Sequence, residues 1–108
     1  MSGIGNVHFL MGEHGGFCLH QTAPDIYELH IAIKPEGRGK WGFDAQREVI
    51  NFAAQNGVGT LLALIDPNHK PLAVYARRGG MRPTEHSVEA LGTTYQIYSL
   101  EVPSCRQQ

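Results

Sequence analysis

Residues 31–42 read Ile-Ala-Ile-Lys-Pro-Glu-Gly-Arg-Gly-Lys-Trp-Gly, a β-branched apolar run followed by a proline and a glycine-rich basic turn. A helical pattern starts directly after it, so the segment predicts a strand, a tight turn and a helix in close succession. The first turn of a helix leaves four backbone N–H groups without intrahelical partners, and the helix dipole adds partial positive charge there. Because Arg38 and Lys40 reinforce that charge, we expect the turn to bind a phosphate group.

The same glycines have a simpler interpretation. Gly37, Gly39 and Gly42 can serve only to form the turn, since glycine is the usual residue wherever the chain bends sharply. The two cations beside them favour phosphate binding over this alternative.

Hydrophobic periodicity divides the chain into eight elements. A helix is expected from Trp41 to a stop at Gly57, and a second from Pro71 to Arg78. The run 60–65 is short and continuously apolar, which is typical of a strand that is buried on both faces and reached through a helical crossover from the strand at 26–33. The expected strands lie at 6–11, 17–22, 26–33, 60–65, 81–90 and 94–102.

This order predicts an α+β or α/β/α-like, three-layer domain with a mixed, mostly antiparallel sheet and one central βαβ crossover. The 108 residues fit a single domain, 1–108, with its core at about 7–102 and a flexible tail at 103–108.

Composition excludes several classes of protein. A net charge of −1 lacks the basic balance of a dedicated nucleic-acid binder, so no nucleic-acid partner is expected. No apolar run approaches the roughly 20 residues that cross a bilayer, and no signal peptide is evident. The two cysteines are far apart in sequence and form no CxxC pair, and the spacing of His8, His14 and His20 matches no zinc site. We expect a cytoplasmic protein that holds no metal.

The strand at 26–33 carries two polar side chains on one face. Strand alternation places Tyr27, Leu29, Ile31 and Ile33 on one side and Glu28, His30 and Ala32 on the other. Glu28 or His30 is therefore a candidate general base, since a histidine with a pKa near 6.5 needs little adjustment for that role. Alternation alone also produces an exposed polar strand face, so the two interpretations stand side by side.

The order of these motifs resembles the core of the GCN5-related N-acetyltransferase (GNAT) superfamily. In that family a strand near a proline leads into an arginine- and glycine-rich turn, a helix, a buried strand, an asparagine and a short helix bearing a tyrosine. Here residues 31–40, 61–66 and 68–81 match, with Asn68, Tyr75 and Gly79 in the family's order and spacing. The resemblance covers about 7–102.

The resemblance implies a fold that binds acetyl-CoA, or a related acyl-CoA, and transfers its acetyl group to a small-molecule or peptide amine. Tyr75 matches the tyrosine that protonates the leaving sulfur, with Glu28 or His30 as the base. Tyr75 can equally be a half-buried core residue, and Asn68 a helix cap or Asx turn. The implied cofactor-binding residues are Ile33, whose surroundings supply a carbonyl-binding N–H, and Gly37, Arg38, Gly39, Lys40, Trp41, Gly42 and Asn68.

Two departures from the family pattern bear on function. Counting from Arg38, Trp41 and Phe43 stand where the family has small residues that let the backbone approach the pyrophosphate. The family's N-terminal strand and helices are also expected to be missing, as in short, phage-type members. The alternative function is therefore a weakly active or inactive binding or assembly module, of phage origin. Uncovered sheet edges and an incomplete pocket favour a homodimer.

Overall fold

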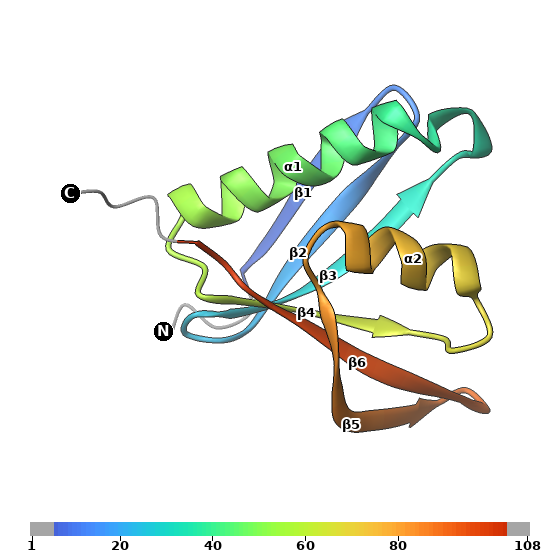
Figure 1. The fold of residues 1–108 in the computed structure, drawn as a ribbon. Helices are drawn as coiled ribbons and strands as arrows, with labels where there is room; N and C mark the ends of the chain where they lie inside the picture. Colours follow the sequence, from blue (N-terminus) through green and yellow to red (C-terminus); the bar gives the residue numbers. More distant parts are fainter. Residues whose placement is uncertain (1–5, 104–108) are drawn as a thin grey trace.

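The computed structural model describes residues 6–103, which form six strands and two α-helices (Figure 1). Each strand and helix expected from the sequence is present, with ends shifted by one or two residues, and a single turn of 3₁₀-helix is added. Of the expected flexible tail, all but Pro103 lies outside the described residues. The elements are β1 (Val7–Gly12), β2 (Gly15–Ala23), β3 (Ile26–Ile33), η1 (Pro35–Gly37), α1 (Lys40–Gln55), β4 (Thr60–Ile65), α2 (Lys70–Arg78), β5 (Arg82–Ala90) and β6 (Thr93–Glu101).

The strands form one sheet in the order β1-β2-β3-β4-β6-β5. Only β3 and β4 run parallel, and α1 connects them, as a parallel pair requires. All other neighbours are antiparallel. This confirms the mixed sheet with a central βαβ crossover that the hydrophobic pattern predicts.

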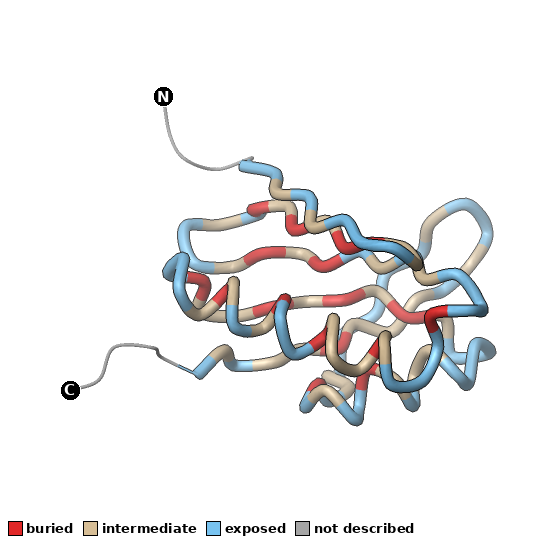
Figure 2. Tube along the Cα trace, turned by 90° about the horizontal axis from the view of Figure 1, so that it is seen from above, coloured by how far each residue is buried: buried red, intermediate tan, exposed pale blue. Residues whose placement is uncertain are grey.

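Both helices cover the same face of the sheet (Figures 1 and 2). Val49 of α1 and Ala76 of α2 belong to one buried cluster with Leu29 and Leu61 of the central strands. The three-layer arrangement expected from the sequence is therefore not seen in residues 6–103, where one helical layer packs on one sheet. As a result β4 is fully buried on one face only, and its residues Thr60, Leu62 and Leu64 are half-buried. We call this second side of the sheet the open face.

The parallel pair β3–β4 separates after three residue pairs. Ile26 pairs with Thr60, Tyr27 with Leu61 and Glu28 with Leu62, and no further pair forms although both strands continue. The pairing of β3 with β2 runs on to Ile33. A V-shaped opening therefore lies between the carboxyl halves of β3 and β4.

No helix within residues 6–103 is long and apolar enough to cross a membrane. At one edge of the sheet, β1 carries no Asp, Glu, Lys, Arg or Pro, the residues that usually protect an edge strand from pairing with another chain. The homodimer is consistent with that edge and stays a prediction, as do the cytoplasmic location and the absence of a nucleic-acid partner.

A buried amide joins the two helices. Gln46 of α1 is buried, and its Nε2 donates a hydrogen bond to the carbonyl oxygen of Tyr75 in α2 at 2.9 Å. A Cβ added at Gly79, which follows α2, would lie 2.4 Å from the same Nε2. Gln46 therefore fixes how closely α2 approaches α1.

Replacing Gln46 by leucine should lower the free energy of unfolding by about 1–3 kcal/mol, because it leaves the carbonyl of Tyr75 without its donor. Urea unfolding measures the change. Gln55→Leu makes the same substitution at an exposed position of the same helix and should stay within about 0.5 kcal/mol of wild type. Equal losses in the two variants would show that the contact contributes nothing specific.

Candidate functional site

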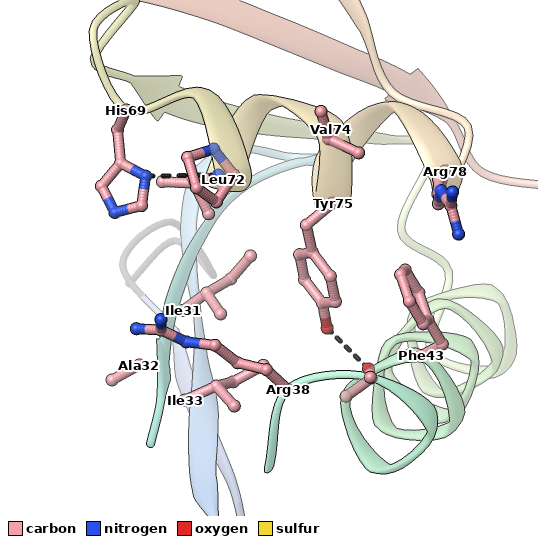
Figure 3. Close-up of a pocket in the computed structure, with 13 residues that line it drawn as sticks. Ile31, Ala32, Ile33, Arg38, Phe43, His69, Leu72, Val74, Tyr75 and Arg78 are labelled. Carbon is pink, nitrogen blue, oxygen red and sulfur yellow. Dashed lines mark hydrogen bonds between the residues drawn. The ribbon is translucent and has the colours of Figure 1, made fainter. Parts of the chain in front are cut away.

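A cavity of about 390 Å³ opens on the helical side of the sheet, beside the carboxyl end of β3 (Figure 3). It lies between that strand, the turn before α1, the first turn of α1 and one side of α2. Its volume falls within the range of small-molecule sites. Among the residues predicted from the sequence, it brings together Ile33, Arg38, Gly39, Gly42 and Tyr75.

The turn before α1 presents backbone donors to this cavity. Gly39 is the N-cap of α1 with φ of 98°, a conformation that favours glycine, and no side chain caps the helix. The N–H of Phe43 bonds to the carbonyl of Gly39, and the bonds of η1 end at the N–H of Arg38. The amides of residues 39–42 thus lack partners among the hydrogen bonds of the described chain, as the first amides of an uncapped helix do, and such amides can bind an anion.

Trp41 does not occupy the cavity. Its ring packs edge-on against His14 of the β1–β2 turn, with 5.1 Å between ring centroids. A Cβ added at Gly12 would lie 2.9 Å from its Cζ2 atom, so the indole lies directly against the hairpin. The bulky residue at a position where the family has a small one is therefore directed away from the space beside Arg38.

Two further candidates from the turn lie outside the cavity lining. Gly37 is buried, and a Cβ there would collide with His14, so this glycine serves close packing. Lys40 forms an ion pair with Asp44 at 2.6 Å, and this hydrogen bond lowers the pKa of the Asp44 carboxyl. Arg47 also pairs with Asp44.

Tyr75 extends from α2 into the cavity (Figure 3). Its hydroxyl donates a hydrogen bond to the carbonyl oxygen of Gly42 at 2.7 Å. Burial raises the pKa of Tyr75 to about 12, so the hydroxyl keeps its proton at neutral pH. The structure thus places Tyr75 in the cavity and also gives it the half-buried position that the alternative interpretation describes.

Sequence reasoning missed an aromatic and cationic wall. Phe43 lies 5.4 Å from the ring of Tyr75 between centroids, and the guanidinium of Arg78 lies 5.5 Å from the Phe43 centroid. Arg78 therefore joins Arg38 as a second cation on the cavity. The signal was present as the pair Arg77-Arg78 on a short helix, which the sequence alone cannot distinguish from a solvated face.

Asn68 does not line the cavity. It is exposed, and its backbone N–H bonds to the Asp66 carboxylate at 2.9 Å. The N-cap of α2 is instead His69, whose Nδ1 accepts a hydrogen bond from the N–H of Leu72 at 3.2 Å. The alternative interpretation of Asn68 as the helix cap is therefore wrong, and the exposed His69 that caps α2 also lines the cavity.

Glu28 and His30 lie on the open face of β3, separated from the cavity by the strand itself. Their side chains approach to 3.8 Å, with His30 56% exposed and Glu28 22% exposed. Glu28 sits at the last residue pair before β3 and β4 separate, and His30 lies on the opening between them. Within residues 6–103 no cluster of three or more His, Cys, Asp or Glu side chains could hold a metal ion.

No family model matches this chain, and no curated protein does. Solved structures do match. A candidate acetyltransferase of the GNAT family from Desulfovibrio desulfuricans has a TM-score of 0.70 and 25% identity, over 83% of this chain and 62% of that one. Spermidine N-acetyltransferase from Vibrio cholerae, solved with CoA and spermine, has a TM-score of 0.72 and 13% identity, over 82% and 58%.

A candidate acetyltransferase from Salmonella typhimurium, solved with its cofactor acetyl-CoA, has a TM-score of 0.70 and 15% identity, over 83% of this chain and 58% of that one. The protein therefore has the GNAT fold, which confirms the resemblance drawn from the motifs. The described chain spans less than two thirds of the length of each of these three proteins. They give no support to a phage origin.

The half-buried hydroxyl of Tyr75 predicts a loss of stability at alkaline pH. An unfolded tyrosine ionises near pH 10, whereas folded Tyr75 holds its proton to about 12, so rising pH in this window favours unfolding. Tyr75→Phe should flatten the fall of unfolding free energy between pH 10 and 12, and should remove one phenolate transition near pH 12 from the absorbance at 295 nm. Identical alkaline profiles for the variant and the wild type would contradict the assigned pKa.

Proposed function

We propose that this protein binds acetyl-CoA, or a related acyl-CoA, and transfers the acyl group to an amine. One observation carries the proposal. The opening between β3 and β4 lies directly beside a cavity that is lined by two arginines and by the uncapped start of α1. The solved structures with the same fold include acetyltransferases with CoA or acetyl-CoA bound, which supports the cofactor class.

The phosphates of the coenzyme fit the turn at Arg38. Unpartnered amides at the start of α1 and the guanidinium of Arg38 offer donors to a diphosphate, and hydrogen bonds between ionised groups are about twice as strong as neutral ones. Arg78 supplies a second positive charge across the cavity, beside Phe43. Trp41 leaves this space free, because its ring packs on the hairpin.

The acyl end fits the opening in the sheet. Beyond Glu28, β3 has no partner on β4, so the backbone groups of its last residues that face β4 are not used by the ladder. An N–H near Ile33 can therefore donate to a thioester carbonyl, the type of preorganised contact that stabilises developing negative charge. The apolar side chains of Ile31 and Leu72 at this end exclude water from the reacting bond.

The groups that act on the amine and on the sulfur lie on opposite sides of β3. The amine nitrogen forms a bond to the acyl carbon, the carbon–sulfur bond breaks, and the electron pair leaves with the sulfur. Glu28 or His30, 3.8 Å apart on the open face, takes the proton of the amine. Tyr75 of α2 lies on the other side of β3, in the cavity where we place the sulfur.

The pKa of Tyr75 refines its role. Thiols are more acidic than this hydroxyl, with a pKa near 8.5 for cysteine against about 12 for Tyr75, so full proton transfer from Tyr75 to a thiolate is uphill. Donation of a hydrogen bond to the departing sulfur is favourable, because it stabilises the thiolate while the tyrosine keeps its proton. Solvent then completes the protonation. To make this contact, the hydroxyl must leave the carbonyl of Gly42.

Replacing Arg38 by alanine should weaken acetyl-CoA binding by about 10- to 100-fold, the worth of a charged hydrogen bond. Isothermal calorimetry with acetyl-CoA measures this. Arg47→Ala, which removes an arginine of α1 that pairs with Asp44 and does not line the cavity, should bind as the wild type does. An unchanged affinity in Arg38→Ala would remove Arg38 from the site.

Tyr75→Phe should lower kcat by roughly 100-fold and leave the affinity for acetyl-CoA nearly unchanged, since the hydroxyl acts on the sulfur only as the bond breaks. Free thiol release with an amine acceptor gives kcat, and calorimetry gives affinity. An unchanged kcat in the variant would show that Tyr75 serves packing and not catalysis. Tight acetyl-CoA binding by the wild type without turnover of any amine would favour the alternative function, a binding module.

A further inference from the structure

A second hollow of about 620 Å³ lies on the open face and shares β3 with the cofactor cavity. Both are lined by the stretch Ile31 to Ile33, one from each side of the strand. The opening between β3 and β4, where His30 lies, connects the two sides. A molecule in the second hollow is therefore next to the place proposed for the acyl group.

Cross-strand register shapes this hollow. Phe9, Cys18 and His30 form one row across β1, β2 and β3, and Met11, Gly16 and Ala32 form the next. Side chains in such rows are immediate neighbours on one face. Gly16 and Ala32 carry little or no side chain, so the second row leaves space near β3. The Met11 side chain lies over Gly16, where an added Cβ would be 2.5 Å from the Met11 Sδ atom.

The exposed walls of the hollow are apolar. Phe9 is 70% exposed and Met11 74% exposed, which is a large amount of unburied apolar surface for two neighbouring positions. Aromatic rings and thioether sulfur both pack well against an aromatic ligand. At its β3 end the apolar surface borders His30. Glu28 lies two residues before His30 on the same face of β3.

We propose that this hollow binds the body of the acceptor, and that the acceptor is a small arylalkylamine: an aromatic ring over Ala32, between Phe9 and Met11, with its amine at Glu28 and His30. The proposal rests on the proposed function and names the substrate class of that site. The hollow, at about 620 Å³, has room for a ligand of this size.

Charge argues against a polyamine in the same place. A polyamine needs a carboxylate for each of its several cations, and the hollow has none among its lining residues. Its one fully charged lining group is Lys34, which repels a second ammonium group. The spermidine N-acetyltransferase with the same fold is thus a relative in fold and not a guide to the acceptor.

Calorimetric titration of the CoA-loaded protein with phenethylamine and with spermidine tests the proposal by binding alone. Phenethylamine should bind at least tenfold more tightly than spermidine. With acetyl-CoA present, thiol release should show the same order in kcat/KM. A calorimetric titration with acetyl-CoA alone tests the proposed function separately.

Three variants locate the binding surface. Phe9→Asp should weaken phenethylamine binding at least fivefold, while Val88→Asp, the same change at an exposed valine of β5 outside the hollow, should not. Met11→Glu supplies the missing carboxylate and should narrow or invert the preference for phenethylamine over spermidine. Urea unfolding and acetyl-CoA affinity check that each variant remains folded.

The outcomes separate the two proposals. Acetyl-CoA binding with equal or tighter binding of spermidine overturns the acceptor class and leaves the proposed function standing. The same holds if phenethylamine binds but Phe9→Asp leaves its affinity unchanged, or if sedimentation shows a dimer that Phe9→Asp dissociates and that does not bind the amine. If acetyl-CoA itself does not bind, both proposals fail.

Discussion

The separation of β3 and β4 after Glu28 and Leu62 is the constraint on which the rest of the site depends. Two parallel strands normally continue to pair, because each lost ladder bond leaves backbone groups that need another partner. Here the carboxyl halves stay apart, and Leu72 and Ala76 of α2 lie beside the opening with Ile31 and Ile65. One side of α2 thus borders a site where main-chain donors remain available.

The position of α2 depends in turn on two polar contacts to α1. The side chain of Gln46 bonds to the carbonyl of Tyr75, and the hydroxyl of the same tyrosine bonds to the carbonyl of Gly42. Both contacts join groups about 30 residues apart in sequence and lie at the border of the cavity. The hydroxyl proposed to act on sulfur therefore joins α2 to α1 in the site without ligand, and this contact must open before the hydroxyl can reach the sulfur.

The periodic parts of the fold could be predicted from the sequence, and contacts between elements could not. Alternation in β3 placed Glu28 and His30 on one face correctly, because period two is a property of the strand itself. The side of the sheet that each helix covers depends on the handedness and packing of the crossovers, which no local pattern records. In the same way, the cap of α2 is decided by the geometry of the Asp66 turn, which directs the backbone of Asn68 to that carboxylate and leaves the cap to His69.

Trp41 illustrates why a motif count can mislead. Neighbouring residues on a helix point about 100° apart, so a bulky side chain at one position and a glycine at the next face different surroundings. Trp41 faces the hairpin, whereas a Cβ at Gly42 would lie 3.0 Å from the carbonyl oxygen of Gly37 and 3.5 Å from Tyr75. The small residue on the cavity side of α1 is therefore Gly42, one position after Trp41. Trp41 thus departs from the family motif without filling the space beside Arg38. A phosphate at this turn would need that space, and would not need a glycine at a fixed number of residues after Arg38.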